Sequence, residues 1–178
     1  ESLNYCSANL VGLFIQCYDA GRGILSNSML HLERLGTENA YQHLSEEDLS
    51  KYVTEVMRFD PTVHHTRREA KETIILNNHK IMKGQSIILF LAAANRDPLE
   101  FVRPQEFDPC RINNHSLLSF GSGMHACLAG RYSIRMTAQA IYWLLQKFRK
   151  IEILEKQIEF ERLYNLRLPK QITLHLKE

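Results

Sequence analysis

The sequence lacks closely spaced cysteines and any strong excess of charge. None of its four cysteines (Cys6, Cys17, Cys110 and Cys127) belongs to a C-x-x-C pair. This spacing argues against a zinc knuckle or a redox-active dithiol and favours reduced thiols. The 22 basic and 20 acidic residues give a formal net charge of +2. Because so small a charge carries no nucleic-acid signature, we expect no nucleic-acid partner.

Long hydrophobic runs, internal repeats and linkers rich in proline, glycine or serine are also missing. The longest apolar stretches, such as residues 87–95, are far too short to span a bilayer, and no signal peptide opens the sequence. We therefore expect a cytoplasmic protein without a membrane partner. The 178 residues, 44% of them apolar, suffice for one well-buried core, and no internal domain boundary is expected.

The most informative segment is the loop at residues 120–127, which reads F-G-S-G-M-H-A-C. Gly121 and Gly123 give the backbone access to conformations closed to other residues, so the loop can approach a flat ligand closely. His125 can offer a hydrogen-bond donor or a positive charge to an anionic group. Cys127 ends the loop with a thiol that can bind a metal as its thiolate. The segment therefore predicts a loop that wraps the edge of a cofactor.

A helix is predicted directly after this loop, from about residue 128 to residue 148. Its apolar residues recur at three- and four-residue steps: Ile134, Ala138, Ile141, Leu145 and Phe148. Cys127 would lie at the helix N-terminus, where free N–H groups and the positive end of the dipole stabilise a thiolate. A thiolate ligand pushes electron density onto haem iron and favours O–O cleavage.

In this segment the chain resembles the cytochrome P450 family, whose haem-binding signature is F-x-x-G-x-[RH]-x-C-x-G. Four residues match it in order and spacing: Phe120, Gly123, His125 and Cys127. The family's last glycine is replaced by Ala129. Because Gly130 follows, we interpret it as taking that glycine's role with one residue inserted.

The resemblance implies a P450-like fold, mainly α with a small β component (α+β). Residues 1–178 would form a single partial domain, the C-terminal haem-binding portion of a longer chain whose N-terminal part is absent. The implied cofactor is haem b (iron protoporphyrin IX), with Cys127 as the metal ligand. Phe120, Gly121 and Gly123 would contact the haem, and His125 would anchor a propionate.

Helical spacing of apolar residues from about residue 4 to residue 35 predicts one helix of about 45 Å. Its middle, residues 16–23, is polar and contains glycine. From the residues alone, a buried helix with an exposed polar stripe is favoured over a helix that crosses a cofactor face. The family resemblance favours the second interpretation.

A second helix is predicted from residue 45 to about residue 58. Ser45 and the acidic residues after it form a typical helix N-terminus, and Pro61 marks the end. Glu55 and Arg58 form the E-x-x-R pattern, which places both side chains on one face and allows a bidentate pair. The resemblance implies that Arg111, in F-D-P-C-R, completes a buried structural triad with them.

Strands are predicted at residues 73–76, 80–82 and 86–91, with turns at 77–78 and 83–84. The R-E-A sequence before them resembles a family motif whose arginine meets a haem propionate. This resemblance implies Arg68, with Arg67 as the alternative. A-N-R-D-P at 94–98 also matches bacterial members. Residues 165–169 and 172–176 resemble the family's terminal β-hairpin.

The long helix departs from the family pattern A-G-x-[DE]-T-T, in which an acid and a threonine deliver protons. Asp19 keeps the acid, whereas Ala20 replaces the threonine, and Gln16 and Cys17 replace the small residues. Losing the hydroxyl removes one ordered proton donor from a site that excludes bulk water. Three interpretations stay open: a substrate hydroxyl or water replaces it, the chemistry does not need it, or the protein is degenerate.

The resemblance implies a haem-thiolate monooxygenase that activates O2 to hydroxylate or epoxidise a small organic substrate, such as a secondary metabolite. Electrons would come from NAD(P)H through a ferredoxin reductase and a ferredoxin. Asp19 and Ala20 would lie at the proton-delivery position. Gln16, and Val63 and His64 within residues 62–66, would border the substrate pocket.

Two alternatives belong to other classes. One is a P450-like enzyme of non-monooxygenase type that catalyses oxidative coupling, desaturation or rearrangement. The other is a catalytically degenerate, haem-poor scaffold. A cysteine hydrolase has no support beyond composition, because His125 is too close to Cys127 in sequence to be the usual base.

Overall fold

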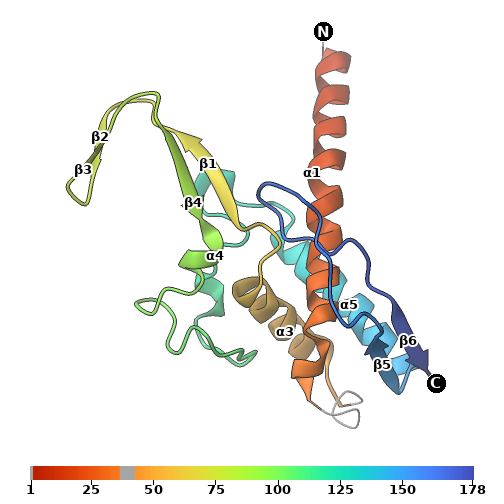
Figure 1. Ribbon diagram of the computed structural model, residues 1–178. Coiled ribbons are helices and arrows are strands. Elements are labelled where there is room, and N and C mark those ends of the chain that lie inside the picture. Colours follow the sequence, from red (N-terminus) through yellow and green to blue (C-terminus); the bar gives the residue numbers. More distant parts are fainter. Residues whose placement is uncertain (1, 37–42) are drawn as a thin grey trace.

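The computed structural model describes residues 2–36 and 43–178 (Figure 1). These ranges are mainly helical with small sheets, which confirms the predicted fold class. The helices are α1 (Ser2–Leu30), α3 (Glu46–Phe59), α4 (Leu91–Ala94) and α5 (Gly130–Lys147), with 3-10 turns η1 (Leu32–Leu35), η2 (Asn114–Ser116) and η3 (Gly123–His125). The strands pair antiparallel in twos: β1 (His65–Glu69) with β4 (Ser86–Phe90), β2 (Ile74–Leu76) with β3 (His79–Ile81), and β5 (Lys150–Ile153) with β6 (Leu174–Lys177).

The two halves of α1 have different surroundings. Near its C-terminal end Ile24, Asn27 and Met29 are buried, whereas the large apolar side chains from Leu3 to Tyr18 are exposed. Figure 1 shows the N-terminal turns of α1 projecting beyond the other elements. The helix ends at Leu30, earlier than predicted, because residues 32–35 continue as the 3-10 turn η1. Thus α1 is anchored to the core at one end.

Gly23 lets α1 approach the segment after α3 closely. A Cβ added at this position would overlap the buried Thr62 side chain. By contrast, a Cβ at Gly21 would meet nothing within 4 Å. Glycine therefore fixes the distance between α1 and Thr62 at one point of the helix and not at the other.

The predicted second helix is confirmed, and its cap has the expected form. The Ser45 hydroxyl accepts from the Asp48 N–H at 3.1 Å, and the Asp48 carboxylate accepts from the Ser45 N–H at 3.0 Å. This reciprocal capping satisfies two groups that a helix terminus leaves unpaired. The helix packs on α1 and α5, and seven of its residues are buried: Leu49, Tyr52, Val53, Glu55, Val56, Met57 and Arg58.

The hydrophobic core lies where α1, α3 and α5 meet. From α5 it receives Ala138, Ile141 and Leu145, which pack with the buried residues of α3 and with Ile24 and Met29. Burying one side chain of this size stabilises the fold by about 1.5–3 kcal/mol. The helix predicted after Cys127 is confirmed, with a start at Gly130 rather than 128. The core thus holds the segment that carries the cysteine.

The sheets β1–β4 and β2–β3 form an arm that projects from the helices (Figure 1). Its tip turns at Asn77 and Asn78, whose φ angles of 45° and 64° lie in the left-handed region that asparagine tolerates. The strands predicted around this turn and at 86–91 are confirmed. Strand β1 was not among the predicted strands, because H-T-R-R-E carries no apolar alternation.

The predicted pairing within the C-terminal tail is wrong. Strand β6 pairs with β5, which places Ile151 opposite Leu176 and Ile153 opposite Leu174. Residues 166 and 169 instead make isolated bridges to Val63 and Phe160. The physical reason is that Ile151 and Leu174 pack against the central core, whereas Leu168 of the segment at 165–169 is fully buried outside that cluster.

Asp60 joins three segments directly after α3. Its carboxylate lies 3.1 Å from His31 Nε2 and 2.9 Å from Arg167 Nε, and its carbonyl accepts from the Asn27 amide at 3.1 Å. Burial opposes ionisation of this carboxyl. The His31 hydrogen bond and the Arg167 charge outweigh burial, so the pKa of Asp60 is lowered. The ionised form therefore fastens α1 and the tail to the end of α3.

Among residues 2–36 and 43–178, no helix combines the length and hydrophobicity needed to cross a membrane.

We predict that Asp60→Asn in the intact protein lowers the free energy of unfolding at pH 7 by about 1–3 kcal/mol, because a charged hydrogen-bond acceptor is lost. A lowered pKa in the folded state contributes stability that is present above the unfolded value of about 3.9 and is lost as pH falls through the folded value. The difference between wild type and variant should therefore shrink below about pH 4. Urea unfolding from pH 7 to pH 3 measures it.

The exposed acid of the Glu159–Lys170 pair serves as the control for Asp60. Glu159→Gln should leave stability nearly unchanged across this range, because exposed ion pairs contribute little. A difference between wild type and Asp60→Asn that stays constant from pH 7 to pH 3 would contradict the role given to the Asp60 carboxylate.

Candidate functional site

The loop before α5 is fixed by its own backbone hydrogen bonds. The Gly121 N–H donates to the Leu118 carbonyl at 2.8 Å, and the Cys127 N–H donates to the Phe120 carbonyl at 2.7 Å. Gly121 and Gly123 both have φ near +70°, a region that favours glycine. Each predicted glycine thus has a backbone conformation that requires it, and the loop closes on itself directly before the cysteine.

The Cys127 side chain is exposed at the end of this loop. It lies just before α5 rather than within its first turn, because Ala129 is the N-cap residue and Gly130 begins the helix. Cys127 thus precedes the N-cap residue by two positions. His125, at the end of η3, is exposed as well.

Gly130 packs against the ring of Phe120. A Cβ at position 130 would lie 3.1 Å from Phe120 Cγ, closer than side chains normally approach. Phe120 itself packs against the central core. The glycine after Cys127 therefore allows the first turn of α5 and the start of the cysteine loop to close around Phe120.

Glu55, Arg58 and Arg111 lie together beside the connection between α4 and α5. Glu55 and Arg58 are fully buried and form a bidentate pair, with nitrogen–oxygen distances of 2.8 and 2.7 Å. Arg111 Nε lies 3.7 Å from Glu55 Oε1, and the Asp108 N–H donates to the same oxygen at 2.8 Å. The three residues of the predicted triad are thus neighbours, and Glu55 is the shared acceptor.

The remaining Arg58 donors bind backbone carbonyls of the connection between α4 and α5. Nη1 donates to the carbonyls of Asn95 and Pro104, and Nη2 donates to that of Glu106, at 2.9, 3.0 and 3.0 Å. Every guanidinium N–H is therefore used. Sequence reasoning missed these acceptors, because a carbonyl carries no residue-type signal.

The predicted proton-delivery position lies on α1. Asp19 lies 3.6 Å from Arg22, one helical turn on, and Arg22 lies 3.8 Å from Glu161 of the tail. Ala20 is half-buried and adds no hydroxyl, and Gln16 is exposed. Arg22 was not predicted. Its spacing of three residues from Asp19 was the available signal.

The segment at 62–66 connects α3 to β1 and packs on the tail. Val63 bridges Leu166, and the His64 N–H donates to the Asn165 carbonyl at 2.9 Å. Burial lowers the pKa of His64 below its ordinary value. The predicted pocket residues Val63 and His64 therefore lie next to each other, half-buried, at the base of the β1–β4 arm.

Arg67 and Arg68 point to opposite faces of β1, because successive strand residues alternate. Arg67 donates to the Ser86 hydroxyl at 2.7 Å. Arg68 donates to the Thr66 hydroxyl at 2.8 Å and is exposed. The alternation means that one of the two arginines faces away from any group that the other contacts.

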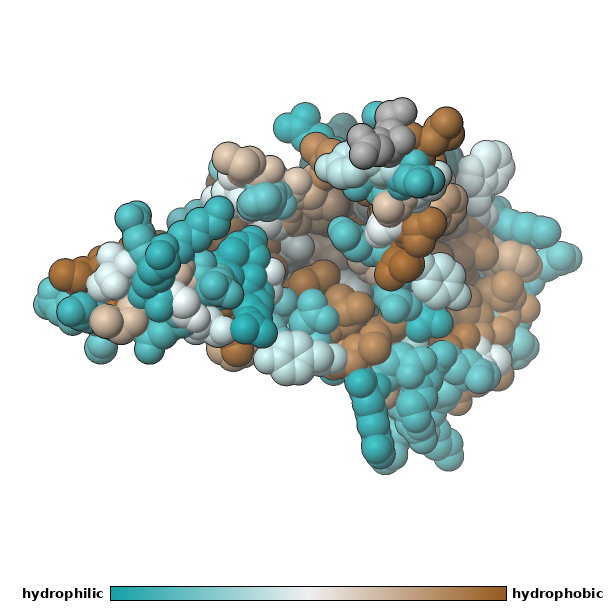
Figure 2. Space-filling view, turned by 90° about the horizontal axis from the view of Figure 1, so that it is seen from above, coloured by the Kyte–Doolittle hydropathy of each residue, from teal (hydrophilic) through white to brown (hydrophobic). Residues whose placement is uncertain are grey.

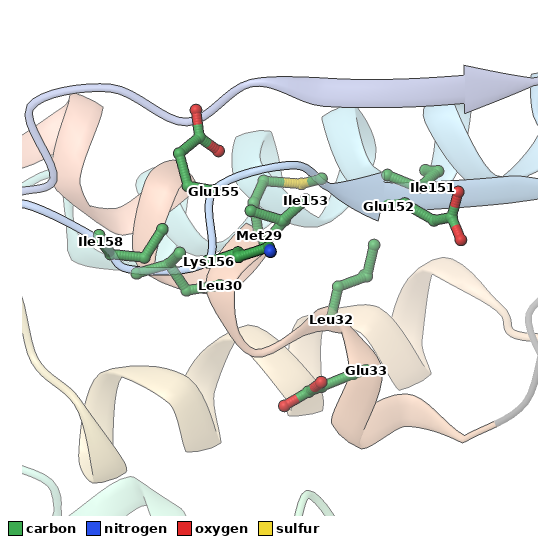
Figure 3. A pocket seen from close by; sticks show the side chains of 10 residues that line it. All are labelled: Met29, Leu30, Leu32, Glu33, Ile151, Glu152, Ile153, Glu155, Lys156 and Ile158. Carbon is green, nitrogen blue, oxygen red and sulfur yellow. The ribbon is translucent and has the colours of Figure 1, made fainter.

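Figure 3 shows a cavity of about 610 Å³ between the end of α1, η1 and β5, lined by Met29, Leu30, Leu32, Glu33, Ile151, Glu152, Ile153, Glu155, Lys156 and Ile158. None of the predicted site residues lines this cavity, whereas Arg111 lines a second one beside α3. Within residues 2–36 and 43–178, no three His, Cys, Asp or Glu side chains gather as a metal site. Figure 2 shows hydrophobic side chains gathered in the middle of the upper face, beside the mainly hydrophilic arm.

The comparisons with known proteins agree on one family. The Cytochrome P450 family pattern matches residues 38–174. The chain is 34% identical over 158 residues to Cytochrome P450 119 of Sulfolobus acidocaldarius, which covers 88% of this chain and 41% of that protein. It is 32% identical over 156 residues to the Biotin biosynthesis cytochrome P450 of Bacillus subtilis, covering 87% and 39% respectively. The chain thus spans about two fifths of the length of the curated relatives it matches.

Solved structures show the same likeness. The crystal structure of P450BioI in complex with an acyl carrier protein ligated to hexadec-9Z-enoic acid superposes with a TM-score of 0.80 at 28% identity, covering 89% of this chain and 41% of that one. The versatile P450 enzyme CYP109B1 from Bacillus subtilis gives 0.77 at 27% identity, with 88% and 42% covered.

We predict that Glu55→Ala destabilises the intact protein by about 3–5 kcal/mol, because it leaves the buried Arg58 charge uncompensated. The matched control is Glu106→Ala. Glu106 forms an ion pair with Arg103, three residues earlier, at 2.8 Å, and both side chains of this pair are exposed. That change should cost about 0–1 kcal/mol. Chemical unfolding of both variants measures the contrast, and equal losses would refute a special role for the buried pair.

Proposed function

The chain belongs to the cytochrome P450 family, and on that premise we propose that it forms the cysteine-bearing C-terminal portion of a haem-thiolate monooxygenase. The reaction would use O2 to oxidise a small organic substrate. The observation that carries this proposal is the exposed Cys127 thiol at the end of a preformed glycine loop. The span of two fifths of the relatives' length supports treating residues 1–178 as a partial domain.

The residues around Cys127 fit the family's cofactor, haem b. A Cβ at Gly123 would meet nothing within 4 Å, so the surface beside the loop is open to a flat group. Met124 and Leu128 expose apolar side chains close to the thiol in sequence, as contact with a macrocycle requires. Haem held by a cysteine thiolate supplies O2 activation and O–O cleavage.

We assign the remaining roles to this chain's own residues. Cys127 would hold the iron, Phe120, Gly121 and Gly123 would shape the loop beside the haem, and His125 and Arg68 would donate to the propionates. Support for Arg68 over Arg67 comes from their hydrogen bonds: Arg67 binds the Ser86 side chain across the sheet, whereas Arg68 contacts neighbours on its own strand.

Asp19 would hold the proton that the reaction consumes, at the polar part of α1. Ala20 leaves no hydroxyl beside it, so we propose that a substrate hydroxyl or an ordered water completes the path. Gln16, Val63 and His64 would border the substrate. Electrons would come from NAD(P)H through a ferredoxin reductase and a ferredoxin, which implies a cytoplasmic location.

A second function is favoured by one observation. The Asp19 carboxylate lies near the Arg22 guanidinium, which itself contacts Glu161. Ala20, next to this ion pair, supplies no hydroxyl that could pass a proton on. This arrangement favours a P450 enzyme of non-monooxygenase type, in which substrate coupling, desaturation or rearrangement replaces oxygen insertion. Products formed under labelled O2 distinguish the two functions.

We predict that Cys127→Ala abolishes the thiolate-type absorption of the reduced, CO-treated intact protein, because the iron loses its sulfur ligand. Cys110→Ala is the matched control, since that thiol is also exposed but follows no glycine loop. It should leave the spectrum unchanged. The opposite pattern would end the assignment of Cys127.

We predict that Ala20→Thr increases the product formed per NAD(P)H for substrate analogues that lack a hydroxyl, because it restores a fixed donor beside Asp19. Ala20→Val is the control of equal shape without the hydroxyl and should give no increase. The native substrate should be well coupled in the wild type and less well accommodated by either larger side chain. Equal coupling in all three proteins would place residue 20 outside the proton path.

A further inference from the structure

Asn95 is a buried residue whose polar groups all have partners on different segments. It is fully buried at the C-terminal end of α4. Its N–H donates to the Leu91 carbonyl within α4, and its carbonyl accepts from Arg58 Nη1 at 2.9 Å. Its side-chain oxygen accepts from the Leu118 N–H at 2.7 Å, and its side-chain nitrogen donates to the Ser119 hydroxyl at 2.7 Å. One residue thus connects the buried arginine of α3 to the residues just before Phe120.

The orientation of the Asn95 amide is determined by these partners. The Leu118 N–H requires an acceptor, so the oxygen must face it, and a flipped amide would place two donors together. The Ser119 hydroxyl accepts from Asn95 and donates to the Met57 carbonyl, which belongs to α3. The Asn95 nitrogen also lies 3.5 Å from the same carbonyl. The Asn95 side chain and the Ser119 hydroxyl thus form a small hydrogen-bond network with the Met57 carbonyl of α3.

The network continues to the cysteine through the backbone. Leu118, held by Asn95, accepts from the Gly121 N–H at 2.8 Å, and this bond closes the turn in which Gly121 takes its left-handed conformation. Phe120, which follows Ser119, accepts from the Cys127 N–H at 2.7 Å. Both backbone hydrogen bonds are short, so the loop is tied to the two residues on either side of Ser119.

We propose that Asn95 is a positioning residue that fixes the Cys127 loop relative to the buried Glu55–Arg58 pair. A loop held in one arrangement presents the Cys127 thiol at one place and angle. The effect of Asn95 on iron binding therefore rests on the proposed function. Asn95 touches neither the cofactor nor the substrate in this assignment. It acts through Leu118 and Ser119.

The test compares Asn95→Asp with Asn113→Asp in the intact protein. Both substitutions replace an amide by a carboxylate on the connection between α4 and α5, and the half-buried Asn113 donates to the Glu100 carbonyl instead. Asn95→Asp keeps an acceptor for Leu118 but removes the donor to Ser119. Ser119→Ala removes the same link from the other side with little risk to folding.

Hydrogen exchange of individual backbone amides is the first readout. Exchange at Leu118, Gly121 and Cys127 should accelerate about tenfold or more in Asn95→Asp and in Ser119→Ala, because a buried link is broken. Exchange at Ile141, in the core of α5, should stay within about twofold of wild type, since a positioning role is local. Asn113→Asp should change none of these rates.

The second readout is the reduced, CO-treated spectrum of the haem-loaded protein. Asn95→Asp should convert part of the thiolate-type signal to the thiol type, whereas Asn113→Asp should not. Equal loop exchange in Asn95→Asp and Asn113→Asp, or an acceleration at Ile141 as large as that at Cys127, would overturn the proposal. The exchange comparison decides the role of Asn95 even if the wild type gives no thiolate-type signal, which separates this inference from the proposed function.

Discussion

A guanidinium group without access to solvent needs an acceptor for each of its five N–H groups, and Arg58 finds them on Glu55 and on three backbone carbonyls. Those carbonyls belong to residues 95, 104 and 106, in a connection with little regular structure. Without a regular ladder, buried carbonyls of such a segment need donor partners from elsewhere, and the Arg58 N–H groups pair with three of them. The buried arginine therefore fastens the irregular connection to α3. The cysteine loop is the last part of this connection before α5.

Aromatic rings surround the buried pair. Phe59 and Phe101 lie within 5.9 and 5.4 Å of the Arg58 guanidinium, so the charge is surrounded by rings as well as by oxygens. Phe120 packs on Gly130 in the first turn of α5 and on the central core. Cys127 lies outside this packed zone, where its thiol is exposed. A thiolate that holds a metal must be accessible, while the backbone that carries it must be held in place. The exposed Cys127 thiol next to packed residues meets both needs.

Local patterns in the sequence predicted the elements whose stability is local. The Ser45 cap, the apolar spacing of the three long helices and the Asn77–Asn78 turn each depend on neighbouring residues, and each is present. Pairings between distant segments were not predictable in this way. The polar strand β1 was missed. Strand β6 pairs with β5 because Ile151 and Leu174 both pack against the core, and the sequence of residues 165–176 carries no information about residue 151. The motif resemblance grouped Glu55, Arg58 and Arg111, which are neighbours in the structure. It did not reveal the contacts of Asn95, Ser119 or the carbonyl acceptors, because these contacts depend on how the chain folds.

The most direct test of the central claim is the identity of the atoms bound to iron in the intact, haem-loaded protein. Iron K-edge X-ray absorption distinguishes a sulfur neighbour from nitrogen and oxygen neighbours. If the loop held through Arg58 presents Cys127 to the haem, the wild type will show one sulfur ligand, and Cys127→Ala will show none. An iron bound by nitrogen and oxygen alone in the wild type would contradict the claim.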